Sequence, residues 1–348
     1  MSTAEGGGAA IADRELSIFF SEFSDFSRVI LAVSGGPDST ALLSLAARWR
    51  AARKNGPVFV AATIDHRLRR EAKKEAAAVA RLAKKLKIPH HTLVWTGKKP
   101  KTGLQQSARA ARYSLLLGLA RKLGADAIAT AHTRDDQAET VLHRIARGSG
   151  INGLAGIRRR RERDGIIVLR PLLDVAKTRL LATLRQARIP FADDPSNRDP
   201  RFLRARLRKL APGLEREGID AAKLSLLARR LARANTAIER TAAEEWKRAL
   251  RGTSRSAFEF DARSYFALPA EIALRLLGRA IDGIGHEGPA ELRKLEALQA
   301  ALADAQAAKR ALKRTLAGAV IELVGGSIHI DSAPARRKPR PRAAARTR

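Results

Sequence analysis

The 348-residue chain contains no cysteine, which excludes disulfide bonds, cysteine-based zinc sites, iron–sulfur clusters and thiol nucleophiles together. No run of eighteen apolar residues occurs, so we expect no membrane-spanning helix. The first ten residues lack the basic and then apolar order of a signal peptide. The sequence therefore predicts a cytoplasmic protein without membrane attachment.

Acidic residues are scarce. The chain has 35 Asp and Glu against 67 Lys and Arg, which gives a formal net charge of +32. An imbalance of this size favours a polyanionic partner, and nucleic acid is the leading candidate. Arginine outnumbers lysine, which suits the recognition of phosphates and bases by a planar guanidinium group. The length favours two domains over one.

The first 190 residues alternate short apolar runs with amphipathic helical patterns. After a helical lead-in at 13–26, we expect strands at 29–33, 58–64, 90–95, 126–131 and 166–173, separated by helices that include 71–87, 104–123, 135–147 and 175–188. This alternation is typical of an α/β, Rossmann-like fold with a parallel sheet covered on both faces. Ligands bind such a sheet beyond the carboxyl ends of its strands.

The rest of the chain reads as mainly helical. We expect a basic helix at 201–209, long helices over 219–251, 270–283 and 290–312, and a hairpin of 319–324 with 327–331 about Gly325 and Gly326. The predicted domains are a disordered N-terminus (1–12), an α/β domain (13–212), a smaller, mainly helical accessory domain ending in the hairpin (213–333) and a disordered basic tail (334–348). Pro212 and Gly213 mark the predicted boundary.

The segment Ser-Gly-Gly-Pro-Asp-Ser at 34–39 joins the first strand to a helix and is called the 34–39 loop below. Unpaired N–H groups at a helix start attract anions, and glycines let the backbone approach a phosphate closely. Asp38 would repel such a ligand unless a cation lay between them, so the sequence predicts bound Mg²⁺. The alternative is an ordinary helix start capped by Asp or Ser.

A second polar group follows the fourth strand. Asp136, Glu139, Thr140 and His143 have the spacing i, i+3, i+4 and i+7, so they share one helix face, and His132 stands just before that helix. A titratable stripe at the mouth of a parallel sheet favours a functional site over a solvated helix face. A zinc site is disfavoured because the spacing matches no usual motif.

These motifs together resemble a known family. The 34–39 loop resembles the pyrophosphatase loop of the N-type ATP pyrophosphatases, or PP-loop proteins. Combined with the motifs at 65–69, 131–140, 147–150 and 194–197, it resembles the tRNA(Ile)-lysidine synthetase family over roughly residues 28–210. Longer members of that family continue into a further carboxyl-terminal domain, so we expect a short form here.

The resemblance implies a ligase that joins L-lysine to C2 of the wobble cytidine, position 34, of tRNA(Ile) with a CAU anticodon. An adenylated cytidine would be the intermediate, ATP the co-substrate, Mg²⁺ the cofactor, and pyrophosphate and AMP the products. The Thr63 and Ile64 backbone would lie beside the adenine. The other ATP-binding residues carried over from the family are Ser34, Gly35, Gly36, Pro37, Asp38, Ser39, Arg112 and His132.

The catalytic candidates carried over in the same way are three acids. Asp38 and Asp136 would bind magnesium, and Asp136 and Glu139 would recognise lysine or accept its proton; the division of these roles stays open. The candidate tRNA-binding residues are Arg201, Arg204, Arg206 and Arg208, with the basic run at 158–161 and the tail as further candidates. Whether the enzyme is a homodimer also stays open.

Two rival interpretations remain. Another PP-loop tRNA-modifying enzyme, such as a sulfur-inserting or glutamine-dependent one, is disfavoured because those enzymes commonly depend on cysteine. A non-enzymatic basic RNA-binding protein would explain the charge of the chain. It would not explain why Asp38, Asp136 and Glu139 stand where a phosphate should bind, since acids there weaken RNA binding.

Overall fold

The computed structural model describes residues 8–67, 72–97, 99–100, 102–192, 203–253 and 257–334, without the side chains of 203–205 and 253. The chain divides into two compact units, residues 1–148 with 152–232 and residues 149–151 with 233–348. The boundary predicted at 212–213 instead falls inside helix α8 (Leu203–Arg216), which continues through Pro212. Within the described ranges, no helix is both long and apolar enough to cross a membrane.

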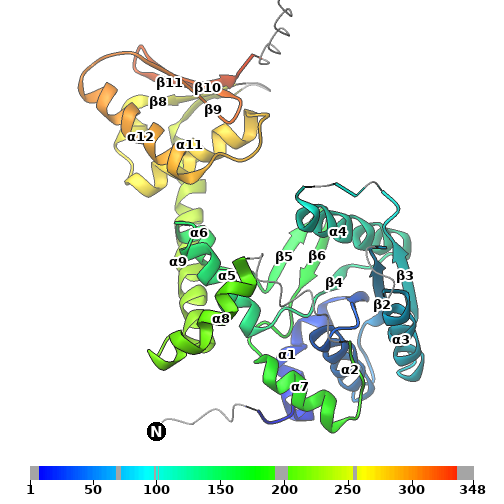
Figure 1. Ribbon diagram of the computed structural model, residues 1–348. Helices are drawn as coiled ribbons and strands as arrows, with labels where there is room; N and C mark the ends of the chain where they lie inside the picture. The colour runs from blue at the N-terminus through cyan, green and yellow to red at the C-terminus, as the bar shows by residue number, and fades with distance from the viewer. Residues whose placement is uncertain are drawn as a thin grey trace, which may run out of the picture. The chain divides into compact units, whose positions relative to one another are not determined.

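The first unit is built on a six-stranded sheet in the order β3-β2-β1-β4-β6-β5 (Figure 1). Five strands are parallel, as predicted: β1 (Arg28–Ala32), β2 (Val58–Asp65), β3 (His90–Val94), β4 (Ala127–Ala129) and β6 (Ile166–Leu169). The chain leaves β1 first toward β2 and later toward β4, so the order reverses at β1, where α/β sheets bind ligands.

The edge strand β5 (Arg160–Arg163) was not predicted. It runs antiparallel to β6, and all four of its residues are exposed. Strand prediction depends on apolar residues at alternate positions, and an exposed run of charged residues has none.

Side chains of the central strands alternate between two cores because a strand has a period of two. Val29 and Leu31 of β1 enter the core formed with α1 (Asp13–Phe19), α2 (Pro37–Ala51), α3 (Ala72–Lys85) and α7 (Lys177–Gln186). Ile30 faces the other way, into the core formed with α4 (Leu104–Leu123). Both faces of the sheet are therefore covered, and the carboxyl edge of the strands is left for a site.

Aromatic rings fix the start of the chain against this sheet. Phe23, from the short 3₁₀ helix Ser21–Asp25, packs edge-on against Trp49 of α2 at 5.8 Å between ring centroids. It also packs edge-on against Phe59 of β2 at 5.3 Å. The predicted lead-in at 13–26 thus forms two short helices that anchor α2.

Two further helices of this unit lie near the carboxyl edge. They are α5 (Arg134–Ile145), the helix predicted to carry the acidic stripe, and α8. Apolar side chains join α5 to the first turns of α9 (Ala221–Ala249): Ala138 and Val141 pack with Leu224 and Ala228. The short α6 (Ile151–Leu154) follows α5.

The second unit combines the later turns of α9 with α10 (Ala262–Phe266), α11 (Ala270–Ile284), α12 (Leu292–Ala307) and an antiparallel sheet. The sheet order is β7-β8-β11-β10-β9, with β7 (Leu250–Thr253), β8 (Ala257–Asp261), β9 (Leu312–Leu316), β10 (Ala319–Val324) and β11 (Ser327–Ser332). The predicted hairpin is confirmed as β10 and β11. The helix predicted over 290–312 ends at Ala307, because Lys309 has a left-handed φ of 49°.

Candidate active site

The 34–39 loop connects β1 to α2 at the carboxyl edge of the sheet. Gly35 has a φ of 89°, which disfavours any residue with a side chain, and Gly36 is the N-cap of α2. The carbonyl of Gly35 accepts hydrogen bonds from the Ala192 N–H at 2.9 Å and from the Thr40 hydroxyl at 3.2 Å. The turn is therefore held from both sides in a conformation that suits glycine.

The two serines of the loop bond to each other and to the turn. The Ser34 N–H donates to Ser39 Oγ at 3.0 Å, and Ser39 Oγ donates to the Gly36 carbonyl at 3.0 Å. No side chain caps the start of α2 from its N-cap position, which Gly36 occupies. The alternative of an ordinary Asp- or Ser-capped helix is thus wrong, and the first turn keeps N–H groups for an anion.

Asp38 is the most unusual group of the loop. Its Oδ2 lies 3.1 Å from Nζ of Lys177, the first residue of α7, while its buried Oδ1 has no hydrogen-bond partner among the described residues. Burial raises the pKa of Asp38, and the negative charges of Asp136 and Asp135 act in the same direction, against the opposing effect of Lys177. A carboxylate in this state favours an additional cation.

The start of α5 lies beside this pair. Thr133 and Asp136 form a capping box, in which the Asp136 N–H donates to Thr133 Oγ1 at 3.3 Å and the Thr133 N–H donates to Asp136 Oδ2 at 2.8 Å. Asp135 Oδ2 accepts the N–H of Lys177 at 2.8 Å. The starts of α5 and α7 are therefore joined, and the charges of Asp135 and Asp136 on α5 are close enough to act on Asp38.

Glu139, one turn further along α5, forms an ion pair with Arg208 of α8. The guanidinium group binds both carboxylate oxygens, with Nη2 at 2.9 Å from Oε2 and Nε on Oε1. Glu139 makes the largest contribution to the raised pKa of Arg208, and the negative charges of Asp136 and Asp38 act in the same direction. Arg208 thus lies among the three predicted catalytic acids.

Of the other predicted tRNA-binding residues, Arg206 is exposed on α8. Arg201 and the side chain of Arg204 lie outside the described residues, as does the predicted motif at 194–197.

His132 follows β4 at the same edge, with Nδ1 2.9 Å from the Thr130 hydroxyl. The pKa of His132 is lowered to about 4, mainly by burial and with a contribution from the positive charges of Arg170, Arg109 and Arg112, against the opposing effect of Asp136. The imidazole is therefore neutral at neutral pH. Within the described ranges, no group of three His, Cys, Asp or Glu residues is placed to hold a metal ion together.

Backbone direction at the end of β2 bears on the predicted adenine contact. Ala62 accepts a hydrogen bond from Val33, on the β1 side, whereas Asp65 accepts one from Trp95, on the β3 side. Backbone groups of a strand alternate in direction, so those of Ile64 point toward the β1 side. The β1 ladder ends at Ala32, and Ile64 is therefore past it, beside the 34–39 loop.

Gln137 fixes the orientation of α5. Its side chain is 3% exposed, accepts the Ile157 N–H at 2.6 Å and donates to the Ile157 carbonyl at 3.1 Å. Gly156 has a φ of 68°, and a Cβ there would lie 2.6 Å from Gln137 Oε1. The acids at the site are thus supported by a buried clamp behind them.

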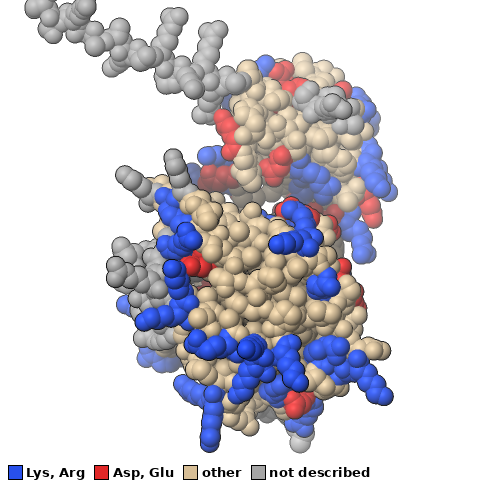
Figure 2. All heavy atoms as spheres, turned by 90° about the vertical axis from the view of Figure 1, so that its right-hand side faces the viewer, with Lys and Arg blue, Asp and Glu red and all other residues tan. Residues whose placement is uncertain are grey.

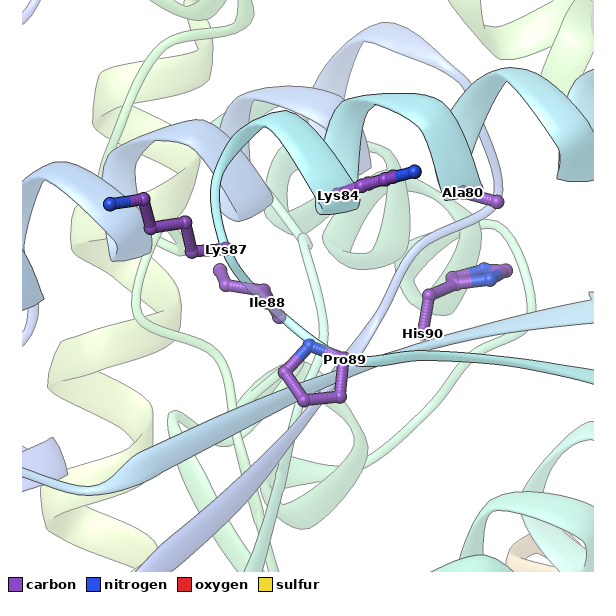
Figure 3. Close-up of a pocket in the computed structure, with 6 residues that line it drawn as sticks. All are labelled: Ala80, Lys84, Lys87, Ile88, Pro89 and His90. Carbon is purple, nitrogen blue, oxygen red and sulfur yellow. The ribbon is translucent and has the colours of Figure 1, made fainter.

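A cavity of about 350 Å³ lies elsewhere in the first unit (Figure 3). Its lining comes from the end of α3 and the beginning of β3, that is, Ala80, Lys84, Lys87, Ile88, Pro89 and His90. The cavity lies where β3 begins, whereas the candidate site lies where the parallel strands end. These are opposite edges of the sheet, so the cavity is separate from the candidate site.

The structure therefore brings Asp38, Asp136, Glu139 and His132 to one edge of the sheet. It adds two partners that the sequence patterns did not reveal. Lys177 is the first residue of α7, a helix that begins with neither a glycine turn nor an acidic motif, so no sequence pattern around it indicates a functional residue. Asp135 was visible as a neighbour of Asp136, but its role in capping α7 depends on tertiary contact.

Comparisons with known proteins agree on the family. A family model described as the PP-loop domain matches residues 9–214. The chain is 54% identical over 337 residues to a tRNA(Ile)-lysidine synthase of Rhodopseudomonas palustris, covering 94% of this chain and 97% of the relative. It is 52% identical over 348 residues to the one of Bradyrhizobium diazoefficiens, covering 94% and 96%.

A solved structure shares the fold. The U34-tRNA thiolase of Methanococcus maripaludis, which carries a [4Fe-4S] cluster, superposes with a TM-score of 0.54 at 14% identity. The match covers 64% of this chain and 77% of the thiolase. At that identity the likeness concerns the fold alone.

Proposed function

The chain belongs to the tRNA(Ile)-lysidine synthase family of PP-loop proteins, and we propose that it joins L-lysine to C2 of the wobble cytidine in tRNA(Ile) with a CAU anticodon. The cytidine would first be adenylated with loss of pyrophosphate, and the lysine amine would then displace AMP. The observation that carries the proposal is the convergence of the 34–39 loop with Asp38, Asp136 and Glu139. We place this reaction in the cytoplasm, with the second unit assisting tRNA binding.

The 34–39 loop is suited to hold the pyrophosphate part of ATP. Attack at the α-phosphorus needs the β- and γ-phosphates fixed as a leaving group, and uncapped N–H groups at the start of α2 offer donors for them. Ile64 offers backbone groups for the adenine edge. Arg112 of α4 lies near His132 and adds positive charge for the phosphates.

Magnesium fits the residues present. Mg²⁺ is usually bound by one or two carboxylates together with substrate phosphates and water, so a three-residue protein site is not required. The buried Oδ1 of Asp38, which has no hydrogen-bond partner among the described residues, is a suitable ligand, and Asp136 is the second candidate. When bound, the ion would neutralise charge that develops on the leaving pyrophosphate.

The acidic stripe on α5 is suited to lysine. An ammonium group needs a carboxylate partner, and the attacking amine must lose a proton before it forms the new bond. Asp136 and Glu139 stand one helical turn apart at the site and provide groups for both tasks. The ion pair with Arg208 holds Glu139 in a fixed orientation.

The rival functions fit less well. A thiolase with a cluster or a thiol nucleophile needs cysteine, which this chain lacks. A binding protein without activity would gain nothing from a buried, partly unpaired carboxylate beside an anion site, since that group weakens phosphate binding.

The test is a reaction of the purified protein with unmodified tRNA(Ile), ATP, Mg²⁺ and L-lysine. We expect release of AMP and pyrophosphate, and a modified cytidine heavier by one lysine residue on nucleoside mass spectrometry. Omission of lysine should stop AMP release. If tRNA binds but neither AMP nor pyrophosphate appears, the binding-protein alternative is correct.

A further inference from the structure

A group of arginines surrounds Tyr113 on the far side of β4 from the 34–39 loop. Tyr113 of α4 is 5% exposed, and its ring has the guanidinium carbons of Arg109 at 5.4 Å and Arg163 at 4.6 Å. Arg170 also hydrogen-bonds with Tyr113 and has Arg109 and Arg161 as charged neighbours. We call Arg109, Arg161, Arg163 and Arg170 with Tyr113 the Tyr113 arginine cluster.

The register of β5 explains why only part of its basic run belongs to this cluster. Successive side chains of a strand point to opposite faces, so Arg161 and Arg163 share one face. Arg160 faces the other way and pairs with Asp25 at 3.5 Å. Arg159, just before the strand, pairs with Glu22 at 2.7 Å.

The cluster arginines differ from Arg159 and Arg160 in this respect. Among the described residues, no carboxylate lies within ion-pair distance of any of the four. Arg170 is 6% exposed, and although one Nη donates to the Arg158 carbonyl at 2.6 Å, its buried Nε has no hydrogen-bond partner in the described part of the chain. Placing several guanidinium groups together without acids costs free energy unless an anion joins them.

Basic charge alone would not identify a site, because this protein exposes Lys and Arg widely. Figure 2 shows many such side chains on the face of the first unit that it presents. The Tyr113 arginine cluster differs from these other basic residues in two ways: Arg170 is buried, and the ring of Tyr113 lies beneath exposed arginines. Guanidinium groups stacked on an aromatic ring and free of acids are suited to phosphate.

The position of the cluster indicates which phosphate. Arg170 follows β6 and Arg109 lies near the start of α4, so both are at the carboxyl edge, and both bring positive charge toward His132. The phosphates of ATP already have the 34–39 loop beyond β1, on the other side of β4. The remaining polyanion in the proposed reaction is the tRNA, whose target nucleotide must reach this edge.

We propose that the Tyr113 arginine cluster binds the phosphodiester backbone of the substrate tRNA beside the nucleotide that is modified. This inference rests on the proposed function and adds to it the surface that positions the RNA strand. Arg161 and Arg163 continue the contact along β5, away from the carboxyl edge, at about 7 Å from one to the next as alternate residues of a strand.

The test compares two double variants that each remove two positive charges. Arg161→Ala with Arg163→Ala changes the cluster. Lys84→Ala with Lys85→Ala changes the exposed last turn of α3, which leads into the start of β3 at the opposite edge and has no contact with the cluster in the described part of the chain. All four side chains are exposed, so both variants should fold, which thermal melting would verify.

Binding of tRNA(Ile) is measured between 50 and 200 mM KCl, without ATP or lysine. We expect the cluster variant to bind about tenfold more weakly and the slope of log affinity against log salt to fall by about 1.4, as for two lost phosphate contacts. The control variant should keep at least most of the slope of the unchanged protein. Equal slopes in all three proteins would overturn the inference, as would a raised KM for ATP with an unchanged tRNA slope.

A second arm locates the contact. A tRNA with neutral methylphosphonate linkages on both sides of the target cytidine should bind the unchanged protein more weakly, with little further loss in the cluster variant. Equal losses in both proteins would place the contact elsewhere and overturn the inference. Absence of lysidine formation by the unchanged protein would instead overturn the proposed function, so the two failures are distinguishable.

Discussion

The ammonium group of Lys177 lies 3.1 Å from Oδ2 of Asp38, although 139 residues separate them in the sequence. The pair joins the first turn of α7 to the 34–39 loop. Asp135 fixes the backbone of Lys177 by accepting its N–H at 2.8 Å. Lys177 is therefore positioned to place a positive charge where the ATP phosphates are proposed to bind.

Lys177→Met should impair the adenylation step. Without its ammonium group, the pKa of Asp38 should rise further, because the largest influence that lowers it is removed. We expect kcat for pyrophosphate release to fall at least about tenfold, and the acid limb of the pH–rate profile to move to higher pH. Lys177→Arg should restore part of the rate, and Lys122→Met on exposed α4 should have no effect. An unchanged acid limb in Lys177→Met would contradict this role.

Asp38→Asn should abolish pyrophosphate release with little change in tRNA affinity. The substitution keeps the shape of the side chain but removes the charge that would bind Mg²⁺ through Oδ1. Titration of the variant with Mg²⁺ in the presence of ATP measures the loss directly. Asp25→Asn, which removes an exposed acid paired with Arg160, is the matched control. A large loss of tRNA affinity in Asp38→Asn would count against the metal role.

His132 should make the protein less stable as the pH falls from about 6.5 to about 4. Its pKa is lowered to about 4 in the folded protein, so in this range the unfolded chain binds a proton that the folded one does not. The free energy of unfolding should therefore decrease by up to about 3 kcal/mol over this window through His132 alone. Urea unfolding at several pH values measures it.

The variant His132→Gln isolates this contribution, because other groups titrate in the same window. It should show a shallower decrease in stability between pH 6.5 and 4 than the unchanged protein. Lys122→Gln, at an exposed position of α4, should keep the original slope. Identical slopes in all three proteins would show that His132 is protonated equally in the folded and unfolded states.

The central sheet and the 34–39 loop could be predicted because their signals are local. Apolar runs such as the one ending at Val33, followed by two glycines and a proline, define a strand, a turn and a helix start within a few residues. The pairing of Glu139 with Arg208 could not be predicted, since it depends on how α8 packs on α5. Strand β5 was missed for a related reason: its pairing with β6 is a tertiary contact, and its own residues carry no apolar pattern.

Gly156 should tolerate alanine less well than Gly165, although both have a left-handed φ, of 68° and 79°. At Gly165 nothing lies within 4 Å of an added Cβ, so Gly165→Ala should cost only the conformational strain, about 1 kcal/mol. At Gly156 the Cβ would also displace the Gln137 side chain from the Ile157 backbone. Gly156→Ala should therefore destabilise the protein by about 3 kcal/mol, measured by urea unfolding. Because Gln137 is next to Asp136 on α5, Gly156→Ala should also lower the rate of lysine transfer, whereas Gly165→Ala should leave that rate unchanged. Equal effects of the two substitutions on stability would mean that the hydrogen bonds between Gln137 and Ile157 do not hold α5.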